Sequence, residues 1–64
     1  MARMLLNSDD VKVLKDVLRD TEELDISDVS DAIVNAMEME GWDRSWAYRI
    51  ADFGLKHREA FLAN

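Results

Sequence analysis

The amino-acid sequence predicts an all-α fold, a small three-helix bundle, and three observations lead to this prediction. The chain has 64 residues, 48% hydrophobic and 34% charged, which is the balance of a folded domain rather than a disordered chain. It contains no proline and only two glycines, so little in it would interrupt a helix. Its apolar residues recur every three or four positions. We therefore treat residues 1–64 as a single small helical domain, with residues 1–6 as a candidate N-terminal arm.

The first predicted helix spans residues 8–22. Asn7 precedes it as a candidate N-cap, and Asp10 stands three residues later, where its carboxylate can complete a capping box. Leu6 and Val11 have the spacing of a hydrophobic staple. At about 100° per residue, the apolar side chains fall on one arc: Val11, Val13, Leu14, Val17 and Leu18. This helix should therefore bury one face.

The second predicted helix spans residues 26–40. Asp25 is the candidate N-cap, with Asp28 in the capping-box position and Ser27 as the rival cap, and Gly41 ends the helix. The predicted buried stripe is apolar: Ile26, Val29, Ala32, Ile33, Ala36 and Met37. The polar residues gather opposite it: Asp28, Asp31, Asn35 and Glu38. The acidic residues of this segment should therefore share one exposed face.

The third predicted helix spans residues 44–62, with Asp43 as its N-cap. Its predicted core arc holds most of the large rings of the chain: Trp42, Trp46, Ile50, Phe53, His57, Ala60 and Phe61. Trp42 is expected to cover the core rather than to serve as a ligand platform. Ala47, Ala51 and Gly54 form a small-residue face that would let another helix, from this chain or from a partner, approach closely.

A further apolar stripe on the third helix exceeds what one core face requires. Tyr48, Leu55 and Leu62 are spaced seven residues apart, away from the predicted core arc. Such a stripe is typical of contacts between helices, so we predict that these three residues bind a partner or pair two copies of the chain in a homodimer. The alternatives are that they cover a loosely packed core or lie under the N-terminal arm.

The charge is unevenly distributed along the chain, whose net charge is -6. Residues 1–40 carry eleven acidic and four basic side chains, whereas residues 41–64 carry three acidic and four basic ones. No lysine or arginine occurs between Asp20 and Glu40. A surface of this kind attracts basic partners and repels nucleic acid. We therefore predict that Asp28, Asp31 and Glu38 are partner-binding residues.

The residue types needed for catalysis or for a metal centre are not grouped in the sequence. His57 is the sole histidine, and no nucleophile or orienting group stands near it on the helix, so it is interpreted as a packed side chain. Asp25, Asp28 and Asp31 lack the glycine-containing pattern of a calcium loop and are interpreted as a cap and a solvated face. No phosphate-binding motif occurs. We expect no enzymatic activity, no metal and no cofactor.

The leading hypothesis is a non-enzymatic acidic protein-protein interaction module, an inhibitor or regulator that docks on a basic, nucleic-acid-binding type of surface on a partner protein. The alternative is a structural homodimer without a separate ligand. A helix-turn-helix-like DNA binder is less favoured than either, because the bulk charge opposes phosphate. The basic residues that would serve it are on the third helix: Arg44, Arg49, Lys56 and Arg58.

The expected location is the cytoplasm. No apolar run reaches the roughly 20 residues that span a bilayer, so no membrane contact is expected. The N-terminal MARMLL is too short for a secretory signal. The absence of cysteine agrees with a reducing compartment. A chain of this size hides only about 60% of its unfolded surface, and without disulfides self-association is the common way to gain further stability.

Overall fold

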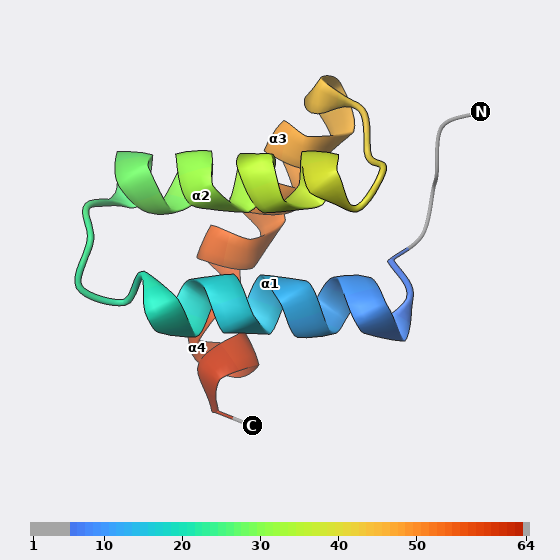
Figure 1. Ribbon diagram of the computed structural model, residues 1–64. Helices are drawn as coiled ribbons and strands as arrows, with labels where there is room; N and C mark the ends of the chain where they lie inside the picture. Colours follow the sequence, from blue (N-terminus) through green and yellow to red (C-terminus); the bar gives the residue numbers. More distant parts are fainter. Residues whose placement is uncertain (1–5, 64) are drawn as a thin grey trace.

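The computed structural model describes residues 6–63 and shows an all-α fold, as predicted. Its helices are α1 (Ser8–Asp20), α2 (Ile26–Met39), α3 (Arg44–Lys56) and the short α4 (Arg58–Leu62). Figure 1 shows α1 and α2 side by side and antiparallel, with α3 crossing behind both of them. The predicted arm lies outside the described residues except for Leu6, which packs against the core.

The start of α1 follows the predicted capping box. The backbone N–H of Asp10 donates to Asn7 Oδ1 at 2.8 Å, and the backbone N–H of Asn7 donates to Asp10 Oδ2 at 3.1 Å. The helix ends at Asp20, two residues before the predicted end, and the hydroxyl of Thr21 donates to the carbonyl of Val17 at 2.6 Å. That bond satisfies a carbonyl of the last turn, so the helix end is closed by a side chain.

The two ends of α2 are formed differently. Asp25 is the N-cap residue, but its side chain makes no capping hydrogen bond, so the predicted capping box with Asp28 is absent. Ser27 lies within the helix and is not the cap. Gly41 follows the C-terminal end with φ at 101°, a conformation that disfavours residues with a Cβ. The N–H groups of Gly41 and Trp42 bond back to the carbonyls of Glu38 and Met37 at 3.1 Å, which is a Schellman motif.

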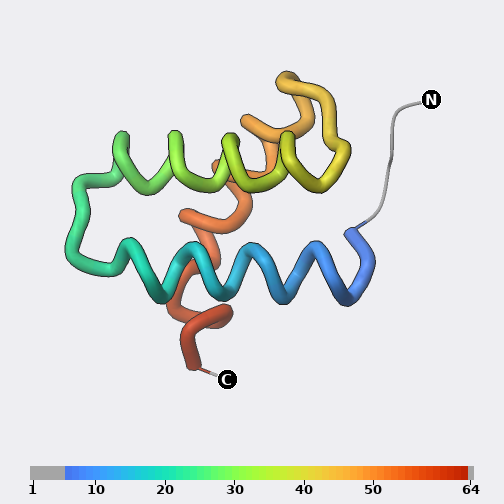
Figure 2. The backbone as a smooth tube through the Cα atoms, in the orientation of Figure 1, coloured from blue at the N-terminus to red at the C-terminus, as the bar shows by residue number. Residues whose placement is uncertain are grey.

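The predicted third helix is interrupted at His57. Asp43 caps α3 as predicted, accepting from the N–H of Trp46 at 3.4 Å, but the helix stops after Lys56 and α4 begins at Arg58. Figure 2 shows the chain turning at this point, and α4 contacts α1. The guanidinium of Arg58 donates to the carbonyl of Glu22, 36 positions earlier, at 2.8 Å. The break therefore directs the C-terminal turn back onto the first half of the chain.

The core lies between the α1–α2 pair and α3. It draws on all three long helices and on the turn before α3: Leu14, Leu18, Val29, Ile33, Val34, Met37, Trp42, Ala47, Ile50 and Ala51. The small-residue face predicted on α3 serves this chain itself. A Cβ added to Gly54 would lie 2.8 Å from Cδ1 of Leu14, so α3 passes α1 at a distance that only a glycine permits without adjustment.

Two predicted core faces require correction. On α2, Ile26 is 68% exposed because it lies at the very start of the helix, whereas Val34 is buried because α2 packs against both α1 and α3. On α3, the buried face consists of Ala47, Ile50, Ala51 and Gly54. Phe53 and His57, which were predicted to be core residues, are exposed. The close approach of α3 leaves no room for large rings at its centre, so they flank the core instead.

Candidate interaction surfaces

The acidic residues predicted on one face of the second helix do lie on the outward face of α2. Asp28 and Asp31 are exposed, and Glu38 is half-buried at the edge of that face. This face points away from α1 and α3, because the buried stripe of α2, which includes Val29 and Ile33, lies on the opposite side of the helix. We call these three acidic residues the acidic surface.

Arg44, at the start of α3, borders the acidic surface. Its guanidinium carbon lies 5.9 Å from the centroid of the Tyr48 ring, at the outer limit of cation–π contact. A hydrogen bond with the Tyr48 side chain, followed by the negative charges of Glu38 and Asp31, raises the pKa of Arg44 above its ordinary value. The ring of Tyr48 therefore lies beside the Arg44 guanidinium, and the charges of Glu38 and Asp31 act on that guanidinium, while Asp28 extends the surface toward the start of α2.

The stripe predicted from Tyr48, Leu55 and Leu62 does not persist as one exposed surface. Tyr48 is 44% exposed, but Leu55 and Leu62 are partly buried and pack against the core. The break at His57 also places Leu62 on α4 rather than on α3. Two of the three residues therefore help to cover the core, which was the alternative interpretation, and Tyr48 alone joins the acidic surface.

The two tryptophans lie on either side of the α3 N-cap. Trp42 is buried in the core as predicted, and its ring lies 6.5 Å from that of Trp46. Trp46 is half-buried, and the guanidinium of Arg49 lies over its ring at 5.2 Å. The two rings therefore pack together at the start of α3, with Trp42 in the core and Trp46 nearer the surface under the side chain of Arg49.

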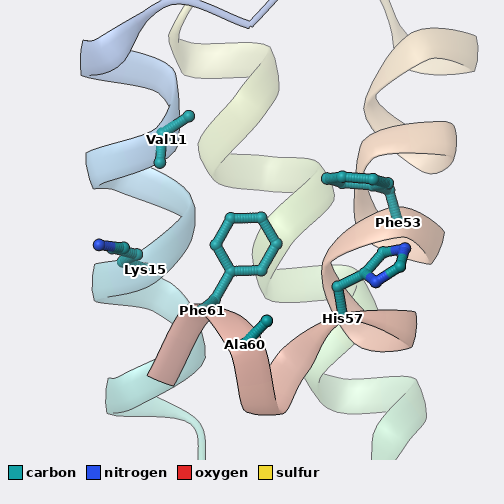
Figure 3. Close-up of a pocket in the computed structure, with 6 residues that line it drawn as sticks. All are labelled: Val11, Lys15, Phe53, His57, Ala60 and Phe61. Atoms are coloured by element: carbon teal, nitrogen blue, oxygen red, sulfur yellow. The ribbon is translucent and has the colours of Figure 1, made fainter. Parts of the chain in front are cut away.

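A groove between α1 and the α3–α4 corner was not predicted. Figure 3 shows the ring of Phe61 standing between Val11 and Lys15 of α1 and Phe53 and His57 on the other side. The ring of Phe53 packs against His57 at 4.8 Å and edge-on against Phe61 at 5.8 Å. The hollow has a volume of about 410 Å³. The sequence predicts that Phe53, His57 and Phe61 share one arc, but it also predicts that they are core residues, and Phe53 and His57 are exposed.

His57, the sole histidine, lies at the junction between α3 and α4. Its ring packs on Phe53, as expected for a packed side chain, but it is exposed to solvent rather than enclosed. Among residues 6–63, no three His, Asp or Glu side chains converge as a metal site would require. Over the same residues, no helix has the length and apolar character needed to cross a bilayer.

Comparison with known proteins gives no family to which the chain can be assigned. No family model, curated protein or solved structure matches it at a significant level. Function is therefore inferred from the surfaces of the molecule described above.

Proposed function

We propose that this protein is a non-enzymatic interaction module that binds a basic protein surface through the acidic surface of α2, and that it acts as an inhibitor or regulator by covering that surface. One observation carries the proposal: Asp28 and Asp31 are exposed together on a helix that contains no basic residue. A one-sign surface of this kind steers a basic partner into contact and orients it. Nucleic-acid-binding proteins present such basic surfaces.

The position of Arg44 supports the choice of partner chemistry. The protein's own guanidinium already lies within the electrostatic influence of Glu38 and Asp31 and beside the ring of Tyr48. A guanidinium from a partner would find the same carboxylates and the same ring. Arginine-rich surfaces are therefore better candidates than surfaces rich in lysine, whose compact ammonium gains less from an aromatic face.

The proposal is tested with a fluorescent nona-arginine peptide as the basic probe, its binding followed by anisotropy. We compare the double variant Asp28→Asn/Asp31→Asn with a matched control, Asp16→Asn/Asp52→Asn. All four aspartates are exposed and lie within helices, so both variants lose the same charge. Asp28→Asn/Asp31→Asn should weaken binding about fivefold and the control variant less than twofold. Salt screens distant charges, so charges close to the bound peptide contribute most to the binding free energy.

Salt separates a specific surface from general attraction. Raising the salt from about 50 mM to about 500 mM shortens the Debye length and should weaken binding of the wild-type chain. Equal losses in the two double variants would mean that the net charge alone attracts the peptide. Binding that is insensitive to salt would contradict an electrostatic contact. Either result overturns the assignment of the acidic surface.

Self-association through α3 is the second candidate, because two aromatic side chains of this helix remain about half exposed. Phe53 is 45% exposed and Tyr48 44% exposed. A dimer that buries Phe53 should melt at a higher temperature as protein concentration rises. Phe53→Glu should abolish that dependence and halve the mass seen by light scattering. Leu55→Glu is less informative, because Leu55 packs against the core. A concentration-independent melt of a monomer excludes this candidate.

A further inference from the structure

We propose that the groove between α1 and the α3–α4 corner binds a small amphiphilic carboxylate, with its apolar body against Phe53 and Phe61 and its carboxylate at the rim of the groove. This site lies on surfaces other than the outward face of α2, and the inference does not depend on the acidic surface. The ligand would contact two rings at the surface of the bundle, Phe53, which is exposed, and Phe61, which is partly buried.

The floor of the groove is apolar and aromatic. Val11, Phe53, Ala60 and Phe61 line it, and the edge-on contact of the two phenylalanine rings at 5.8 Å leaves a face of Phe53 open to solvent. A phenyl group or a short alkyl chain can add to this arrangement by stacking or edge contact. The volume of about 410 Å³ falls within the range of about 300 to 1,000 Å³ that is typical of small-ligand sites.

The rim of the groove is cationic on the α1 side. Lys15 lines the groove with its aliphatic stem, and Figure 3 shows its nitrogen directed away from Phe61, so the ammonium reaches the edge of the groove by rotation of its flexible side chain. A bound carboxylate at this edge would remain partly hydrated while it faces the ammonium. The combination of an apolar wall and a charged edge matches a ligand with an apolar body and one negative charge.

A neighbouring hollow on the α3–α4 side carries further basic groups. A second hollow, of about 420 Å³, shares His57 and Ala60 with the groove. Its further lining residues include two cations and one anion: Lys56, Arg58 and Glu59. Counting the linings of both hollows, Lys15 included, positive side chains outnumber negative ones in a protein whose net charge is -6. Charge complementarity at this corner therefore favours an anion.

The length of the groove favours a small molecule over a partner helix. Its α1 wall runs from Val11 to Lys15, a separation of four positions, which corresponds to about 6 Å along a helix. A helix that docks in a groove uses anchors at positions i, i+4 and i+7, which extend over about 10 Å. The groove holds one such anchor, or one small ligand with a single ring.

The test uses 4-phenylbutyrate as the probe and the neutral 4-phenyl-1-butanol as its matched control. Each is titrated into the uniformly ¹⁵N-labelled chain, and amide shifts are followed by NMR. The carboxylate should bind saturably, with a dissociation constant of about 1 mM or tighter. The largest shifts should occur at Val11, Ala60 and Phe61. The alcohol should bind about fivefold more weakly, because it lacks the charge.

Two pairs of variants check the placement of the ligand. Phe53→Ala should weaken binding of 4-phenylbutyrate at least fivefold, whereas Tyr48→Ala, which removes an equally exposed ring of α3, should leave it unchanged within twofold. Lys15→Met should remove the preference for the carboxylate over the alcohol, and Lys12→Met, on the same helix but outside the groove, should retain it. Circular dichroism confirms that each variant is helical.

The amide shifts of the wild-type chain test the proposed ligand site even where a variant fails to fold. Saturable shifts at the groove residues with a preference for the carboxylate support the proposal. Three results overturn it: no saturation at any accessible concentration, equal binding of acid and alcohol, or shifts centred on α2. None of these results bears on the nona-arginine experiment, so the ligand site in the groove and the acidic surface of α2 are tested independently.

Discussion

Gly54 of α3 lies so close to Leu14 of α1 that a single added carbon would come within 2.8 Å of the leucine Cδ1. Leu14 is fully buried in the core, so its Cδ1 atom can move aside only at the expense of packing with its neighbours. This relationship accounts for a glycine in the middle of a helix, where it costs about 1 kcal/mol relative to alanine. The close crossing at this point also determines which face of α3 becomes the core.

Gly54→Ala should therefore destabilise the protein despite its better helix propensity. Subtracting the propensity gain of about 1 kcal/mol from an overpacking cost of about 1 to 3 kcal/mol leaves an expected net loss of about 1 kcal/mol at the middle of that range. Urea denaturation followed by circular dichroism measures it. A stabilisation of about 1 kcal/mol, the value for an unconstrained helical glycine, would show that the helices can separate freely at this point.

A double-mutant cycle identifies Leu14 as the cause. Leu14→Ala alone should cost about 2 to 5 kcal/mol, since it opens a cavity in the core. In the Gly54→Ala background the same change should cost less, because the shortened side chain also relieves the clash. Additive free energies would contradict direct contact between the two positions.

The capping box at the start of α1 supplies a local prediction. Asn7→Ala removes the Oδ1 atom that accepts from the N–H of Asp10, so it should lower the free energy of unfolding by about 1 kcal/mol. Ser8→Ala, one residue later and also exposed, serves as the control and should change it by less than about 0.5 kcal/mol. Equal effects of the two substitutions would mean that the cap contributes nothing measurable.

The features that the sequence predicted correctly are those fixed by near neighbours in the chain. The caps at Asn7 and Asp43 and the positive φ at Gly41 each depend on residues within four positions, and all three are present. The buried face of α3 depends instead on how closely another helix crosses it. A helical wheel ranks Phe53 above Gly54 as a core residue, whereas the close crossing at Leu14 reverses that order.

The candidate site was predicted only in part, for the same reason. The exposure of Asp28 and Asp31 follows from the periodicity of α2, and the structure confirms that exposure. The electrostatic influence of Glu38 on Arg44 depends on the turn between α2 and α3. The groove depends on the break at His57, which carries neither glycine nor proline to signal it. Packing of α4 on α1 compensates for the interruption, and packing of this kind is not visible in local sequence.

The Schellman motif at the end of α2 predicts a strong requirement for glycine. Gly41→Ala places a Cβ at a φ of 101°, so it should destabilise the protein by about 1 to 2 kcal/mol. Thermal melting or urea denaturation measures the loss. Met39→Ala, at an exposed position two residues earlier, should remain within about 0.5 kcal/mol of the wild type. If both substitutions are neutral, the turn tolerates another conformation.

Arg44 is expected to compete with a basic partner for the acidic surface. The charges of Glu38 and Asp31 act on its guanidinium, so Arg44→Gln should remove a positive charge that offsets them and strengthen binding of the nona-arginine peptide about twofold to threefold. Arg49→Gln changes the net charge equally, but Arg49 lies over Trp46 and is the control. An equal gain in both variants would reflect net charge alone. A loss of affinity in Arg44→Gln would show instead that Arg44 organises the acidic surface, because removal of a mere competitor cannot weaken binding.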